Sequence, residues 1–256
     1  MAANPNRHYG AGRYGNPAPP RDSDALDGVL LVDKPAGPTS HDIVDSLRRQ
    51  FNIRKVGHGG TLDPQATGLL IMLIGRGTKL SNDFMGSDKT YEGTLRLGIT
   101  TSSQDADGEI LEEKDPSAVT EEELRQTMKT FAGDQYQIPP MVSAVKIDGV
   151  PLYKRARKGQ TVEREPRFIH VYKFRLTSCD LPEASFVLRC TKGTYVRTIC
   201  HDLGEKLGCG AHLNALRRTE SGSHHVDQAF SLDTVLSWSR KELEEHIIPM
   251  RTFGRA

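Results

Sequence analysis

Asp63 is the residue whose surroundings point most directly to chemistry. It lies in the segment Gly57-His58-Gly59-Gly60-Thr61-Leu62-Asp63-Pro64-Gln65-Ala66-Thr67-Gly68, whose glycines allow tight turns and close approach of another molecule. Pro64 favours an extended conformation at Asp63. The apolar run 69–74 that follows has the length of a buried strand. A carboxylate held in this way suits covalent or acid-base catalysis, although the local sequence equally allows a turn aspartate that hydrogen-bonds its own backbone.

Three other segments contain residue types that bind phosphate or metal ions. The run Gly75-Arg76-Gly77-Thr78-Lys79 lacks the spacing of a P-loop. A calcium loop beginning at Asp105 would need Gly and Glu where the chain has Ile110 and Pro116. Four potential zinc ligands come later in the chain: Cys200, His201, Cys209 and His212. Cys200 falls on the apolar face of an expected helix and His201 points elsewhere, so the two side chains do not converge on one metal ion. We therefore expect no metal and no cofactor.

The balanced net charge of +1 hides two oppositely charged segments. Residues 104–125 contain nine acidic side chains and two basic ones, whereas residues 137–175 contain nine basic and three acidic ones. A concentrated basic segment suits a polyanion such as RNA, although it can also be no more than a solvated surface.

Two further segments combine aromatic, apolar and cationic side chains. Tyr195 and Arg197 open an expected helix, where the arginine is either a surface charge or the partner of an anion. Tyr91 and Tyr195, taken singly, fit core aromatics as well as stacking surfaces. In Leu216-Arg217-Arg218-Thr219, an apolar residue precedes two cations that could contact phosphate.

Periodicity and capping residues predict alternating strands and helices. Strands are expected at 28–32, 91–97, 184–190 and along a long segment with Phe168, His170, Tyr172, Phe174 and Leu176 on one face. Helices are expected from an N-cap at Ser40 to Leu47, around 80–84, after a capping box of Thr120 and Glu123, at 196–207, and at 233–247. The irregular alternation favours an α+β fold with a mixed, mostly antiparallel central sheet flanked by helices.

The chain divides into three expected parts. Residues 1–25, rich in Asn, Gly, Pro and Arg, are expected to be a flexible tail. A catalytic domain is expected at 26–228, followed by a helical segment at 229–256. We expect neither a secretory leader nor a membrane span, because the sequence has no apolar run of the required kind, and the four cysteines contain no C-x-x-C pair. The expected protein is a cytoplasmic monomer with reduced thiols and no membrane association.

Six segments, in order across about residues 27–225, resemble the TruB family of tRNA pseudouridine synthases. They are Gly28-Val29-Leu30-Leu31-Val32-Asp33-Lys34-Pro35, Gly57 through Gly68, Asp88-Lys89-Thr90-Tyr91, Ile138-Pro139-Pro140-Met141-Val142-Ser143-Ala144-Val145-Lys146, Gly193-Thr194-Tyr195-Val196-Arg197 and Leu216-Arg217-Arg218-Thr219. Family members often carry a C-terminal PUA domain, and the roughly 30 residues after His225 are too few for a complete one, so we expect at most a remnant.

The resemblance implies the pseudouridine synthase fold and the conversion of a uridine in the tRNA T loop, conventionally position 55, to pseudouridine. It implies that Asp63 is the nucleophile, paired with Arg197, whose guanidinium is expected to lower the pKa of the carboxyl. Tyr91 would stack on the flipped base, Tyr195 and Leu216 would line the pocket, and His58 would help to fill the space that the base leaves. We also expect Lys34 and the bases between 146 and 158 to contact phosphates of the T arm. Attack on the sugar, attack on the base and removal of a sugar proton all remain open as the first step.

Two other functions fit parts of the sequence. An RNA chaperone would explain the basic segment but gives no reason for an aspartate in the glycine-rich loop. A hydrolytic glycosidase would need a second carboxylate, and no motif places one.

Overall fold

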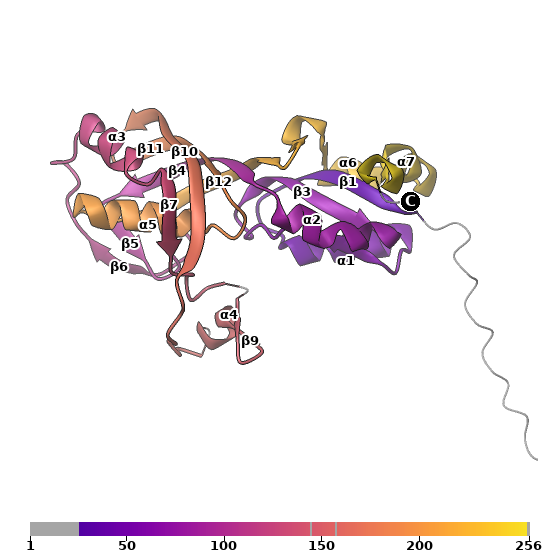
Figure 1. Cartoon of the computed structure of the whole chain (residues 1–256), viewed down its shortest axis with the longest axis horizontal. Helices are drawn as coiled ribbons and strands as arrows, with labels where there is room; N and C mark the ends of the chain where they lie inside the picture. The colour runs from indigo at the N-terminus through magenta and orange to yellow at the C-terminus, as the bar shows by residue number, and fades with distance from the viewer. Residues whose placement is uncertain (1–25, 144, 157, 255–256) are drawn as a thin grey trace, which may run out of the picture.

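The computed structural model describes residues 26–143, 145–156 and 158–254, so the expected N-terminal tail lies outside the described residues. The chain forms an elongated molecule whose two halves share one large mixed sheet (Figure 1). Among the described residues, every helix is too short or too polar to cross a lipid bilayer.

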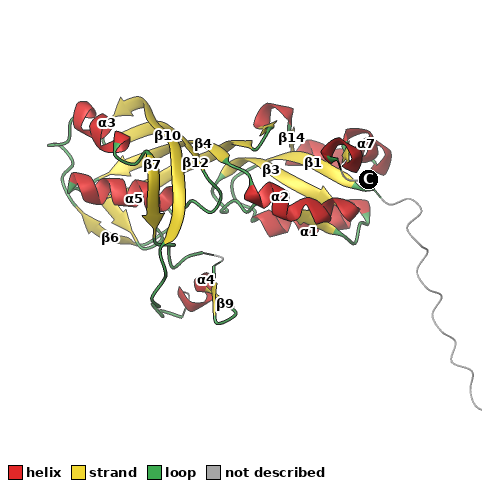
Figure 2. Ribbon diagram, in the orientation of Figure 1, coloured by secondary structure: helices red, strands yellow, loops and turns green. Residues whose placement is uncertain are grey.

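Strands and helices alternate along the chain (Figure 2). The strands are β1 (Gly28–Lys34), β2 (Val56–His58), β3 (Thr67–Ile74), β4 (Lys89–Leu97), β5 (Ile99–Thr101), β6 (Ile110–Glu113), β7 (Gly133–Gln137), β8 (Lys146–Ile147), β9 (Val150–Pro151), β10 (Arg167–Asp180), β11 (Glu183–Cys190), β12 (Ala211–Ser221), β13 (His224–His225), β14 (Phe230–Ser231) and β15 (Ile248–Pro249). The α-helices are α1 (Ser40–Phe51), α2 (Ser81–Gly86), α3 (Glu121–Lys129), α4 (Leu152–Ala156), α5 (Val196–Leu207), α6 (Leu232–Ser237) and α7 (Arg240–His246), and 3-10 helices cover Gly75–Leu80, Val226–Gln228 and Met250–Phe253.

The large sheet has the strand order β14-β1-β3-β12-β4-β11-β10-β7, with β2, β13 and β15 paired at its sides. Within it, β1 with β14 and β3 with β12 are parallel, and the other pairs are antiparallel. The expected mixed, mostly antiparallel sheet is therefore confirmed. The C-terminal segment is not only helical, because β14 and β15 both pair with β1.

The two halves of the sheet are buried differently. In the half with β1 and β3, alternate side chains enter cores on opposite faces, and this explains the uninterrupted apolar run 69–74. One core includes Ile43 and Leu47 of α1, and the other includes Phe84 of α2. In the other half, α3 and α5 contact strands β10 and β12 on one face. In this half Leu95 and Leu188 are fully buried.

The junction between the halves is short. Strand β3 pairs with β12 only at Thr67 with Arg217 and at Gly68 with Arg218. A Cβ on Gly68 would lie 2.3 Å from the backbone oxygen of Arg218, and its φ of +98° is unfavourable for other residues. This glycine therefore allows the close approach of the two strands, immediately after the loop that carries Asp63.

Two expectations about helix ends are wrong. The N-cap of α1 is Thr39, because the Ser40 hydroxyl is turned inward and hydrogen-bonds the backbone of Leu62 instead. The expected helix 233–247 is broken into α6 and α7 at Trp238, which has an extended backbone. The second helix then starts at its own cap, Ser239, whose side chain accepts a hydrogen bond from the backbone N–H of Glu242.

A third wrong expectation concerns the long strand β10. Phe168 and Tyr172 are 59% and 48% exposed, whereas Phe174 and Leu176 are buried. An irregularity in the pairing between Val171 and Lys173 adds one residue to the strand and reverses which face the following side chains occupy.

Candidate active site

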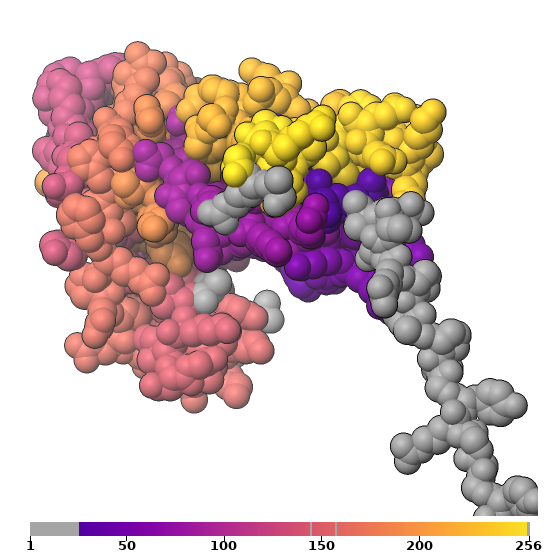
Figure 3. Space-filling model, turned by 45° about the vertical axis from the view of Figure 1, so that its right-hand side comes forward, coloured from indigo at the N-terminus to yellow at the C-terminus, as the bar shows by residue number. Residues whose placement is uncertain are grey.

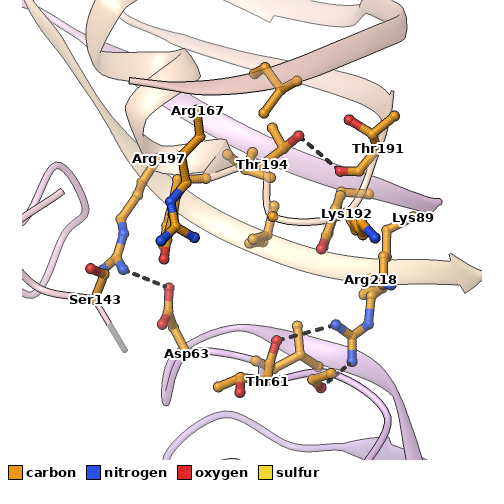
Figure 4. Close-up of a pocket in the computed structure, with 18 of the residues that line it drawn as sticks. Thr61, Asp63, Lys89, Ser143, Arg167, Thr191, Lys192, Thr194, Arg197 and Arg218 are labelled. Atoms are coloured by element: carbon orange, nitrogen blue, oxygen red, sulfur yellow. Dashed lines mark hydrogen bonds and ion pairs between the residues drawn. The ribbon is translucent and has the colours of Figure 1, made fainter. Parts of the chain in front are cut away.

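Asp63 lies in the loop between β2 and β3, beside the junction of the two halves. Its side chain is 49% exposed and lines two adjoining cavities of about 490 and 530 Å³. Both volumes are in the range of small-molecule sites. Figure 4 shows the carboxylate pointing into the first cavity, with Arg197 facing it.

A buried lysine holds the loop on the C-terminal side of Asp63. Lys34 is fully buried, and its ammonium group donates hydrogen bonds to the backbone oxygens of Pro35, Pro64 and Ala66 at 2.9, 2.7 and 2.8 Å. Burial lowers the pKa of Lys34 to about 8, and the Asp63 carboxylate opposes this shift. The expectation that Lys34 contacts phosphate is wrong, because all three of its donors are used inside the protein.

A buried arginine joins the N-terminal side of the same loop to strand β3. Arg218 is 2% exposed and donates to the backbone oxygens of Leu69, Thr61 and Gly60 at 2.7, 3.3 and 3.1 Å. The Ser40 hydroxyl exchanges hydrogen bonds with the backbone of Leu62. Contacts on both sides of Asp63 therefore fix the loop backbone.

The adjacent Arg217 has a different environment. Its guanidinium makes a bidentate pair with the carboxylate of Asp33 at 2.9 and 2.7 Å, and both side chains are partly exposed. Arg218 is therefore not available for phosphate, because it is buried and bound to backbone oxygens, whereas Arg217 is paired with Asp33 but remains partly exposed.

Arg197, in the first turn of α5, lies between two carboxylates. Its Nη2 is 3.5 Å from Oδ2 of Asp63, and its Nη1 is 3.1 Å from Oδ2 of Asp105. Nη2 also donates to the backbone oxygen of Val142 at 2.6 Å. The side chain is 5% exposed, so its position is set by these contacts.

The pKa of Asp63 is raised overall from its ordinary value, although Arg197 lowers it as expected. Desolvation by burial is the largest cause, because protein surrounds the carboxylate on the sides that do not face the cavity. The negative charge of Asp105 adds to the rise in pKa, whereas Arg197 and Lys34 act in the opposite direction. The guanidinium favours the ionised carboxylate as expected, but its effect is smaller than the cost of desolvation.

The predicted pocket residues lie around the first cavity. Tyr91 on β4, Tyr195 before α5 and Leu216 on β12 all line it, and Tyr91 is 9% exposed. Tyr195 is the N-cap residue of α5, and its backbone N–H and oxygen both hydrogen-bond the Gln137 side chain, at 2.8 and 3.0 Å. His58, at the end of β2, does not belong to the residues that line either cavity.

Sequence reasoning misses Asp105 and Gln137. It considers Asp105 only as a calcium ligand, and nothing local indicates that this residue meets an arginine 92 positions later in the chain. Gln137 gives no signal beyond its place just before the Ile138-Pro139-Pro140 segment. Among the described residues, no group of three or more His, Cys, Asp or Glu side chains is arranged to hold a metal ion.

Comparisons with known proteins identify the family of the chain. The model of the TruB family pseudouridylate synthase N-terminal domain matches residues 48–196, and that of the tRNA pseudouridylate synthase B C-terminal domain matches residues 197–253. The tRNA pseudouridine synthase B of Opitutus terrae is 58% identical over 225 residues, which cover 88% of this chain and 93% of that protein. The protein of the same name from Burkholderia pseudomallei (strain 668) is 47% identical over 226 residues, covering 88% and 74% of the two chains.

The fold is also found in solved structures. A chain in a crystal structure of a Cbf5-Nop10-Gar1 complex is similar with a TM-score of 0.70 and 29% identity over 88% of this chain, which spans 60% of that chain. This likeness confirms the expected pseudouridine synthase fold. Taken with the matched family models and the identity to the Opitutus terrae protein, it shows that the chain belongs to the TruB family of tRNA pseudouridine synthases and is an isomerase.

Proposed function

We propose that the enzyme converts the uridine at position 55 of the tRNA T loop to pseudouridine, with Asp63 as the nucleophile. The observation that carries this proposal is the placement of the Asp63 carboxylate at the wall of a cavity, on a fixed loop, 3.5 Å from Arg197. A nucleophile that is held in position reacts faster because little conformational entropy is lost when the transition state forms.

The reaction exchanges one bond of the ribose for another. The bond from C1′ to N1 of the base breaks, the base rotates, and C1′ bonds to C5 while the C5 proton is lost and N1 gains a proton. The role of Asp63 requires an ionised carboxylate, which Arg197 favours. Asp105, which shares the same guanidinium, would limit how strongly Arg197 pairs with Asp63 before RNA binds.

A uridine in an RNA loop must leave its stack before it can reach Asp63, at a cost of a few kcal/mol. In our proposal the ring of Tyr91 stacks on the flipped base, which recovers roughly 1–3 kcal/mol. Tyr195 and Leu216 would form other walls of the base pocket, and both line the cavity. His58 would help to fill the space left in the RNA, and Lys34 would position the loop rather than bind RNA.

The proposed tRNA contacts include a lobe formed by β8, β9 and α4, which projects from the body of the molecule (Figure 1). Figure 3 shows the surface hollowed between this lobe and the half that contains α1 and α2. Lys146, Lys154 and Lys158 belong to the lobe segment and would contact phosphates. A catalytic domain at 26–228 with a C-terminal segment at 229–256, a cytoplasmic location and a monomeric state belong to the same proposal.

Membership of an isomerase family argues against an RNA chaperone that acts without chemistry. To test the target position, an unmodified tRNA transcript and a matched transcript with cytidine at position 55 would be incubated with the enzyme. Pseudouridine would be mapped by selective chemistry, because the product has the same mass as the substrate. We expect one pseudouridine at position 55 in the first transcript and none in the second. Modification elsewhere, with position 55 unchanged, would overturn the proposed site, and released uracil would indicate a glycosidase.

A further inference from the structure

Four ring-bearing side chains form a strip along the free edge of the large sheet. This aromatic strip consists of Tyr136 on the edge strand β7 and Phe168, His170 and Tyr172 on β10. Tyr136 and Phe168 are 74% and 59% exposed and Tyr172 is 48% exposed. Ile169 and Val171, which alternate with the strip residues, are 1% exposed, so the strip lies on the face opposite the core.

The rings are arranged in contacting pairs. Tyr136 and Phe168 are cross-strand neighbours with ring centroids 5.9 Å apart, and those of His170 and Tyr172 are 4.5 Å apart. Exposed aromatic rings at the edge of a sheet present apolar surface to water and invite aggregation. A surface of this kind is therefore more readily explained by a binding partner than by folding.

Two features select RNA as that partner. Phe168 lines the cavity that contains Asp63, so the strip is continuous with the active site. Cations accompany the rings: Arg167 and Lys192 line the same cavity, and the guanidinium of Arg189 lies 5.2 Å from the ring centre of Tyr172. Exposed aromatic residues on an antiparallel sheet, together with cations, are a recurrent means of binding unpaired nucleotides.

We propose that Tyr136 and Phe168 stack on an unpaired nucleotide of the substrate RNA other than the target uridine. This inference rests on the proposed function, because it assumes that the substrate is an RNA loop. The RNA chain leaves the cavity at Phe168 and continues over β7 and β10. The strip thereby contributes affinity for the loop without contacting the reacting atoms.

The test is a double-mutant cycle of binding measurements with a T-arm hairpin. The protein arms are wild type, Phe168→Ala, Tyr136→Ala and the ring-preserving Phe168→Trp. The RNA arms are the intact hairpin and hairpins with one abasic site at each unpaired position except the target. Leu111→Ala, which removes another strongly exposed apolar side chain on β6, is the matched control.

We expect Phe168→Ala and Tyr136→Ala each to raise Kd for the intact hairpin about 5- to 100-fold. Phe168→Trp should keep Kd near the wild-type value because it retains a ring, and Leu111→Ala should leave Kd unchanged. At one of the unpaired positions, we expect the abasic site to weaken binding to the wild-type protein. The same abasic site should not weaken binding to Phe168→Ala any further, because the stacking contact is already absent. Unchanged Kd in both alanine variants, or additive losses at every position, would overturn the inference. So would a change of oligomeric state with unchanged RNA binding, which would assign the strip to protein association.

The outcomes separate this inference from the proposed function. Binding and pseudouridine formation are separate readouts, so a wild-type enzyme that shows the cycle but forms no pseudouridine would refute only the proposed reaction. An enzyme that modifies position 55 but shows no coupling would refute only the strip. Failure of wild type to bind the hairpin would overturn both.

Discussion

Replacing Arg218 with methionine tests whether buried contacts hold the Asp63 loop in place. The substitution keeps much of the side-chain volume but removes the donors to the backbone oxygens of Leu69, Thr61 and Gly60. Each buried acceptor left without a donor costs about 1–3 kcal/mol. The contact to Leu69 is buried, whereas those to Thr61 and Gly60 are partly buried and within reach of water from the cavity, so we expect a total loss of about 2–4 kcal/mol.

Arg217→Met is the matched control, one residue away on the same strand. Its bidentate pair with Asp33 is partly exposed, so its loss should cost only about 0.2–1 kcal/mol. Both variants would be measured by urea unfolding, and their kcat determined on a T-arm transcript. We expect kcat to fall about 100-fold in Arg218→Met, because a displacement of the loop by about 1 Å moves the nucleophile from its position. Equal stability losses in the two variants would refute the reasoning.

Two further predictions concern Asp105 and Gly68. Asp105→Asn removes a carboxylate that raises the pKa of Asp63, so the acid limb of the pH profile of kcat/KM should move to lower pH; an unchanged or upward-shifted limb would contradict this. In Gly68→Ala the new Cβ would lie 2.3 Å from the backbone oxygen of Arg218, so this clash should lower the stability by about 1–3 kcal/mol in addition to the strain of the positive φ. Gly37→Ala has a similar φ but nothing within 4 Å, so thermal unfolding should show only the strain of about 1–3 kcal/mol, and equal losses at the two glycines would count against the argument.

Local patterns are sufficient to predict most elements. The apolar runs 28–32 and 69–74 are parts of β1 and β3, and the helix expected at 196–207 is α5. Periodicity fails where tertiary contacts decide the outcome. The irregularity in β10 changes which side chains face the core, and no residue type in the strand indicates it. Ser40 does not cap α1 because its hydroxyl hydrogen-bonds the backbone of Leu62.

The sequence predicts part of the candidate site but not its electrostatics. The six motifs contain Asp63, Arg197, Tyr91, Tyr195 and Leu216, all of which line one cavity. Sequence cannot reveal whether a cation is buried, so it suggests phosphate contacts for Lys34 and Arg218 although both bind backbone oxygens. The direction of the Asp63 pKa shift also depends on burial, which no motif encodes.

The most direct test of the central claim is a single-turnover comparison of wild type and Asp63→Asn with saturating T-arm RNA. Asparagine keeps the size of the side chain but removes the carboxylate, so RNA binding should persist while pseudouridine, detected by nucleoside chromatography, is not formed. A rate within about tenfold of wild type, a barrier change of only about 1.4 kcal/mol, would contradict the assignment of Asp63 as the nucleophile.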